Sequence, residues 1–166
     1  MRVASLALSA SLCCLAGSPA FASTWYFFSK NDDQLNFFDA DAVEKSDKNV
    51  TVWTKQVQIE QPDVDGSWAT AVHWKINCFK RTGLLLLATS TYDKNDKLIQ
   101  TIPWPDVEFP ATPDSGEESL INMVCEPTFP HDASSKKYVK VPGNDIFQYT
   151  KLYVEHRKSS KNSAPK

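Results

Sequence analysis

Two stretches of the chain alternate with a period of two. The clearer stretch places one set of side chains on a single side: Trp68, Thr70, Val72, Trp74, Ile76 and Cys78. In the other stretch, Val50–Ile59, one side carries Thr51, Trp53, Lys55, Val57 and Ile59, and the other carries Val50, Val52, Thr54 and Gln56. Because successive side chains of a β-strand point to opposite faces of a sheet, both stretches predict strands. The clearer one also places Cys78 on a core face at the end of its strand, where a structural disulfide is expected.

Shorter apolar runs predict four further strands: Trp25–Phe28, Leu35–Phe38, Leu84–Tyr92 and Lys97–Ile102. The last two flank the turn-like segment Asp93–Asp96, in which Asn95 is the residue expected to take the left-handed conformation. The six runs follow one another with no helix-length crossover between them. This order predicts an antiparallel meander.

Two helices are predicted in the last third of the chain. Ser115 and Glu118 form a capping box ahead of an apolar run that leads to Cys125. A second capping segment, Pro142–Asp145, precedes a stripe with helical spacing: Ile146, Tyr149, Thr150, Tyr153 and Arg157. The sequence therefore predicts an α+β fold, a single antiparallel sheet of about six strands with a short helix and a longer C-terminal helix packed on it.

The first 22 residues have the pattern of a secretory signal peptide. Arg2 supplies a positive charge, Val3–Leu15 is apolar, and Ser18–Ala22 offers an A-x-A cleavage site before Ser23. The apolar stretch is shorter than the roughly 20 residues needed to span a bilayer. We expect a signal peptide over residues 1–22, a single domain over 23–158 and a disordered basic tail over 159–166. The mature protein is then exported, to the periplasm, the medium or the cell surface.

Cysteine usage fits an exported protein. Cys13 and Cys14 lie inside the predicted signal peptide, and Leu12 before Cys13 argues against a lipid anchor. Cys78 and Cys125 remain in the mature chain, and two thiols in an oxidising compartment most simply form one disulfide. A redox pair or metal ligation stays open as an alternative, although the chain has no C-x-x-C motif and only three histidines.

The charges are distributed unevenly along the chain. Residues 136–166 carry eight basic and two acidic side chains, whereas residues 23–135 carry nine basic and eighteen acidic ones. Such a segment is either a solvated helix face with a tail or a contact surface for an anionic partner. The basic residues Lys136, Lys137, Lys140, Arg157 and Lys158 are therefore candidate partner-binding residues.

Catalytic and ligand-binding motifs are missing from the sequence. There is no G-x-S-x-G, H-E-x-x-H, P-loop or G-x-G-x-x-G motif, and the histidines lack metal-ligand spacing. Asp63–Gly66 is similar to the start of a calcium loop but lacks the later glutamate, so a turn is predicted. We expect no enzyme activity, cofactor, metal site or nucleic-acid partner. An enzymatic alternative would need carboxylates such as Asp39, Asp41 and Glu108 to meet in one cleft.

The chain has five tryptophans, and most of them are expected in the core. Trp104 is the exception, because Pro103 and Pro105 should keep it out of a sheet ladder and leave it partly exposed. Trp104 is therefore also a candidate partner-binding residue, at a surface or in an aromatic groove.

A series of short motifs between Trp25 and Cys125 resembles the surface-adhesin protein E-like family of bacteria. The motifs are Phe38-Asp39, Val50-Thr51-Val52-Trp53, Lys75-Ile76-Asn77-Cys78, Tyr92-Asp93, Lys97-Leu98-Ile99, Pro113-Asp114-Ser115 and Val124-Cys125. The resemblance implies a small antiparallel sheet with a packed C-terminal helix and one disulfide. It also implies adhesion, since the family takes its name from an adhesin that binds host extracellular-matrix proteins.

The expected function is that of a secreted or cell-envelope binding protein without enzyme activity, an adhesin that contacts host matrix proteins or anionic envelope components. The alternative is a periplasmic carrier of a small haem-like or lipid ligand in an aromatic groove. Whether an edge strand pairs with a second copy to form a homodimer is left open. No transmembrane segment is expected.

Overall fold

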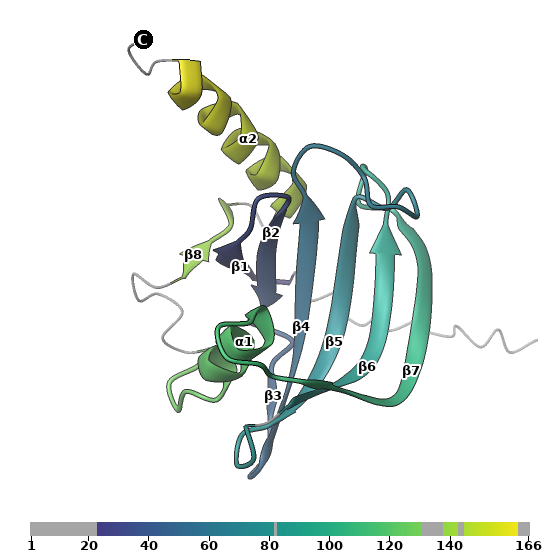
Figure 1. Ribbon diagram of the computed structural model, residues 1–166, viewed down its shortest axis with the longest axis vertical. Coiled ribbons are helices and arrows are strands. Elements are labelled where there is room, and N and C mark those ends of the chain that lie inside the picture. Colours follow the sequence, from purple (N-terminus) through teal and green to yellow (C-terminus); the bar gives the residue numbers. More distant parts are fainter. Residues whose placement is uncertain (1–22, 82, 131–137, 143–144, 163–166) are drawn as a thin grey trace, which may run out of the picture.

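Strands of the described chain form one antiparallel sheet (Figure 1). The structure is a computed structural model that describes residues 23–81, 83–130, 138–142 and 145–162. The strands are β1 (Trp25–Lys30), β2 (Gln34–Asp39), β3 (Glu44–Lys45), β4 (Asn49–Gln58), β5 (Ala69–Asn77), β6 (Gly83–Tyr92), β7 (Leu98–Pro110) and β8 (Val139–Lys140). Their order across the sheet is β7-β6-β5-β4-β2-β1-β8, and β3 pairs with β4. The predicted meander is confirmed from β1 to β7, apart from the short β3.

The predicted number of about six strands is too low, because the described residues form an eight-stranded sheet. The six predicted strands are present, and the two that were missed, β3 and β8, are two residues long and exposed. A strand of two exposed residues leaves no alternation in the sequence. Its pairing depends on where the rest of the fold brings the chain.

Apolar side chains point to both faces of the sheet, which therefore has two cores. The α1-side cluster consists of Phe38, Val50, Val52, Ile76, Leu84, Leu120, Ile121, Met123, Val124 and Phe129. The α2-side cluster consists of Leu35, Phe37, Val57, Ile59, Ala69, Val141 and Ile146. Adjacent residues such as Phe37 and Phe38 are both fully buried, each in a different cluster. A strand covered on both faces is apolar at consecutive positions.

The two helices cover opposite faces of the sheet. Helix α1 (Gly116–Val124) lies across its lower end in Figure 1, while α2 (Ile146–Asn162) begins near the upper ends of β2 and β4 and extends beyond them. The predicted caps are confirmed, since Ser115 Oγ accepts the N–H of Glu118 at 3.1 Å and Asp145 Oδ1 accepts that of Gln148 at 2.8 Å. No helix in this described part is long and apolar enough to cross a membrane.

Some predictions concern residues that the structure does not describe. The signal peptide at 1–22 lies outside the described residues, and so do Lys136 and Lys137. Helix α2 continues to Asn162, so residues 159–162 of the expected tail are helical. The tail and domain boundaries otherwise stay predictions.

Strand β7 is longer than expected and includes Trp104 with its flanking prolines. It runs for 13 residues, and the pairing register with β6 jumps between Leu86↔Val107 and Ala88↔Pro103. Trp104 is part of β7 but lies within this jump and has no paired residue on β6, so the expectation that the prolines keep it out of the sheet ladder is confirmed. Prolines are tolerated at a sheet edge and at bulges, because a missing N–H there breaks no ladder hydrogen bond.

The turn between β6 and β7 also differs in detail from the expectation. Asp96, with φ 60°, takes the left-handed conformation that was expected of Asn95. Asp93 Oδ1 accepts the N–H groups of Asn95 at 2.8 Å and Lys97 at 2.9 Å, which fixes the other turn residues. Aspartate, like asparagine, tolerates this conformation, so composition alone does not choose between them.

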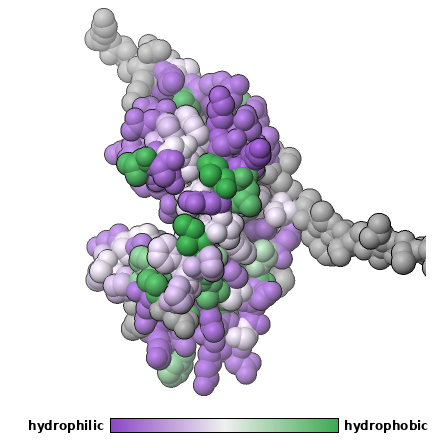
Figure 2. All heavy atoms as spheres, turned by 90° about the vertical axis from the view of Figure 1, so that its right-hand side faces the viewer, coloured by the Kyte–Doolittle hydropathy of each residue, from purple (hydrophilic) through white to green (hydrophobic). Residues whose placement is uncertain are grey.

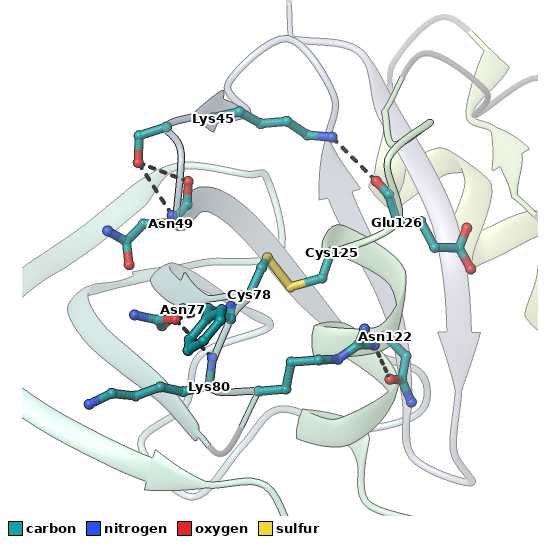
Figure 3. Close-up of a disulfide and its surroundings, with 11 residues drawn as sticks. Lys45, Asn49, Asn77, Cys78, Lys80, Asn122, Cys125 and Glu126 are labelled. Atoms are coloured by element: carbon teal, nitrogen blue, oxygen red, sulfur yellow. Dashed lines mark hydrogen bonds between the residues drawn. A yellow bond between two sulfur atoms is a disulfide. The ribbon is translucent and has the colours of Figure 1, made fainter.

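The predicted disulfide joins Cys78, directly after β5, to Cys125 at the C-terminal end of α1 (Figure 3). One polar contact lies on each side of the disulfide. Lys45 Nζ donates to the carbonyl of Glu126 at 3.4 Å, and an Arg81 guanidinium nitrogen donates to Asn122 Oδ1 at 2.6 Å. The bond therefore holds α1 against the lower end of the sheet.

Candidate binding surfaces

The expectation that most tryptophans lie in the core is wrong. None of the five is among the buried residues: Trp25, Trp53, Trp68 and Trp74 are half-buried and Trp104 is 39% exposed. An indole is large enough to pack one part against a core while another part reaches solvent. The half-exposed indoles provide aromatic surface on both faces of the sheet.

The predicted partner-binding residues do not form one surface. Trp104 lies on β7 and Lys140 on β8, at opposite edges of the sheet. Arg157 donates to the carbonyl oxygen of Asp32 at 3.3 Å and is half-buried, so it holds the β1–β2 turn against α2. Lys158 is exposed and lines a groove beside α2. Among the described members of the set, Lys158 lines this larger groove and Arg157 lines a smaller pocket beside the β1–β2 turn.

This α2 groove lies between α2, the end of β4 and the β6–β7 turn, and has a volume of about 790 Å³. Apolar side chains line its floor: Val57, Ile59, Trp68, Phe147 and Val154. Charged side chains surround it: Lys94, Asp96, Asp145, Lys151, Glu155 and Lys158. An apolar centre with a polar rim is the arrangement found at protein–protein interfaces.

A buried lysine, Lys55, contacts the elements that form the groove. The side chain of Lys55 is 5% exposed and forms an ion pair with Asp96, whose side chain is 50% exposed. The Nζ atom of Lys55 lies 3.7 Å from the ring centroid of Tyr92 and 5.5 Å from that of Phe147. Lys55 thus connects β4 to the β6–β7 turn and to α2 by charge and by cation–π contact.

Burial lowers the pKa of Lys55 below its ordinary value, and the hydrogen bond and charge of Asp96 offset part of this effect. Lys55 is not among the binding residues predicted from the sequence. A signal was present, however, because Lys55 shares a strand side with Val57 and Ile59, and a cation on an apolar side requires a partner. Its partner Asp96 is 41 residues away, and only the folded chain identifies it.

Other titratable groups that could have formed a site instead take part in turns and in ring packing. Asp39 is buried, and its Oδ1 accepts the N–H of Asp41 at 3.1 Å, which closes a turn. Asp63–Gly66 forms the predicted turn, with Gly66 at φ 81°. His73 stacks on Trp53 at 4.5 Å, and burial lowers the pKa of its imidazole. Within the described ranges, no group of three or more His, Cys, Asp or Glu is arranged to hold a metal ion.

Comparison with known protein families identifies a match for most of the described sheet. The family model described as surface-adhesin protein E matches residues 25–126. No curated protein and no solved structure matches the chain. The matched region begins with β1 and ends one residue after Cys125, so it includes both disulfide cysteines and leaves α2 outside.

Proposed function

We propose, on the premise that this chain belongs to the surface-adhesin protein E family, that it is an exported binding protein without enzyme activity. The family indicates a surface adhesin role. Its partners would be host extracellular-matrix proteins or anionic components of the cell envelope. Export would depend on the signal peptide predicted over residues 1–22.

The observation that carries the proposal is the α2 groove. Its apolar floor offers burial to a side chain of the partner, and Lys151 and Lys158 on its rim are exposed and free of ion pairs with described residues. A segment of a matrix protein with apolar side chains and with acidic side chains opposite Lys151 and Lys158 fits both features, provided that its other charges suit Asp145 and Glu155 on the same rim. Seven of the fifteen residues that line the groove lie within the matched region, and the other eight, on α2 and just before it, lie beyond that region.

Binding to immobilised matrix proteins tests the groove. We expect the double variant Lys151→Gln/Lys158→Gln to bind roughly two- to tenfold more weakly at 0.15 M salt, with a flatter dependence on salt, because two rim charges no longer attract the partner. The matched control is Lys48→Gln/Lys80→Gln, which removes two exposed charges away from the groove. Equal weakening by both double variants would indicate non-specific charge attraction. If the groove variant binds as strongly as the original protein, the lysines on the rim do not contact the partner.

Protease treatment of intact source cells tests the location. Loss of the protein would place it on the cell surface, as an adhesin requires. Protection until the outer envelope is opened would contradict a surface adhesin and favour a partner within the envelope.

A small apolar ligand, haem-like or lipid, is the second candidate, because the groove volume of about 790 Å³ lies in the range of small-molecule sites. Titration with haemin or a lysophospholipid should then give a saturable change in tryptophan fluorescence. Trp68→Phe should remove most of the change, since Trp68 lines the groove, whereas Trp104→Phe should retain it. The same response in both variants would exclude the groove as the ligand site.

A further inference from the structure

A row of uncharged hydrogen-bonding side chains crosses the α1-side face of the sheet. Asn36 pairs with Gln56, Gln56 with Thr70, Thr70 with Thr91, and Thr91 with Gln100. The five residues, which we name the amide row, come from β2, β4, β5, β6 and β7. Paired residues of neighbouring antiparallel strands point to the same face, so the row is continuous over five strands.

The next row on this face is also uncharged. Its members follow the same pairings: Phe38, Thr54, Val72, Thr89 and Ile102. Phe38, Thr54 and Val72 of this second row are buried, whereas Thr89 and Ile102 reach the surface next to the amide row. These two rows therefore offer no cationic side chain to a phosphate, a nucleic acid or an acidic polymer, whose binding depends on such side chains.

Two tryptophans are held in fixed positions on the same face. Trp74 Nε1 donates to Thr54 Oγ1 at 3.0 Å, and Trp104 Nε1 donates to Thr89 Oγ1 at 3.0 Å. Because each acceptor lies on the neighbouring strand, each indole leans across the sheet. Phe109 meets Trp74 edge-on with 5.8 Å between ring centroids, and both Phe109 and Trp104 are 39% exposed. These three rings form an aromatic border beside the two rows.

A pocket of about 230 Å³ opens at the β2 end of the amide row. Asn36, Thr54, Gln56 and Trp74 contribute to its wall, and Glu117 from the first turn of α1 is the one charged residue among the described residues that line it. Figure 2 looks onto the β7 side and shows an outline indented at mid-height, with hydrophobic side chains in green on this side. The face is thus hollowed above α1.

Four of the five side chains in the row have polar groups that are available to a ligand, whereas the hydroxyl of Thr91 is buried. Within the part of the chain that the structure describes, the side chains of Asn36, Gln56, Thr70 and Gln100 make no hydrogen bond to the protein. An amide side chain offers both donors and an acceptor, and a threonine hydroxyl offers one donor with acceptor capacity. Each hydroxyl of a sugar also donates and accepts, while the C–H faces of the ring pack on aromatic surfaces.

We propose that this face binds an uncharged glycan chain, with one sugar ring in the pocket and the chain running along the amide row toward Trp104. A peptide strand would pair through its backbone with a sheet edge rather than lie on the middle of a face. The glycan site lies on the face opposite the α2 groove, and it goes beyond the function proposed for that groove. Either site can fail without affecting the other.

Affinity electrophoresis of the mature protein through gels that contain dextran, mannan, galactan or hydroxyethylcellulose tests the proposal. We expect at least one neutral polysaccharide to retard the protein, with little change between 0.05 and 0.5 M salt, as a site without charge requires. The variant Trp104→Ala/Gln100→Ala should bind roughly tenfold more weakly, because it loses an aromatic contact and an amide. Both residues are exposed on the edge strand, so the fold should persist.

Two control variants distinguish the glycan site from the other surfaces of the protein. Trp53→Ala removes a half-buried indole from the opposite face, and Lys151→Gln/Lys158→Gln alters the α2 groove; both should leave retardation unchanged. The proposal is overturned if no neutral polysaccharide retards the folded protein. It is equally overturned if heparin or alginate alone does so and salt abolishes the effect, or if the Trp104/Gln100 variant binds as well as the original protein.

Discussion

Replacement of both Cys78 and Cys125 by serine should lower the melting temperature by about 10–20 °C. The bond joins residues 47 positions apart, and opening a loop of this length costs about 4 kcal/mol of unfolding free energy in the chain-entropy model. Helix α1 contributes four buried residues to the α1-side cluster, and the bond holds its C-terminal end on the sheet. Calorimetry of the two proteins under oxidising conditions measures the difference.

Thiol titration provides the control for this prediction. The original protein, exported and denatured without reductant, should show no free thiol from these two residues, and Cys78→Ser should show one. Two free thiols in the original protein, or an unchanged melting temperature in the double variant, would contradict a stabilising disulfide.

Replacement of Asp96 by asparagine should lower the unfolding free energy by about 2 kcal/mol at pH 7. Removal of one partner from a buried ion pair costs about 3–5 kcal/mol because the other charge stays buried. Here the cost is smaller, since Asp96 is half-exposed and solvent already screens part of the pair. Urea denaturation measures the loss, and Asp47→Asn, an exposed carboxylate at the other end of the sheet, is the matched control.

A double-variant cycle assigns this loss to Lys55. Once Lys55 is replaced by methionine, Asp96→Asn should cost less than about 0.5 kcal/mol, because no buried charge is left without a partner. If Asp96→Asn costs the same in both backgrounds, then the left-handed turn position of Asp96 is responsible and the ion pair is not.

The same variant should differ from the original protein in its response to pH. Burial already lowers the pKa of Lys55, and the loss of Asp96 lowers it further. The ordinary pKa of lysine, 10.5, applies to Lys55 in the unfolded chain. Between the lowered pKa and 10.5, the unfolded chain binds more protons than the folded one, so the free energy of unfolding rises with pH. The deficit of Asp96→Asn is therefore largest below the lowered pKa and shrinks toward about pH 10. Burial raises the pKa of Tyr92, so measurements below about pH 9.5 avoid its titration.

The strands and helices that produce a periodic or local sequence pattern were predicted correctly. Alternation located β4 and β5, and the caps at Ser115 and Asp145 located the helix starts, because a few neighbouring residues determine each of these features. Strand β8 and the Lys55–Asp96 pair depend on contacts between distant parts of the chain. Neither could be read from a short window of sequence.

The amide row depends both on local strand positions and on contacts between distant strands. Asn36, Gln56 and Gln100 each occupy an ordinary polar position in a strand, and none of them attracts notice alone. Their alignment depends on the pairing register of four strand pairs, which the bulges in β6 and β7 shift. Sequence could place each residue on a strand, but the register decides which side chains are neighbours.

The position of β7 at the end of the sheet has a consequence for the solubility of the protein. An open edge offers unpaired N–H and C=O groups on which further chains can assemble into fibrils. Pro103, Pro105 and Pro110 remove N–H groups from this strand, and Lys97 stands before its first residue. These residues leave only Leu98–Ile102 as a segment with five consecutive N–H groups. Lysine and proline thus act as gatekeepers on both sides of the segment most prone to aggregation.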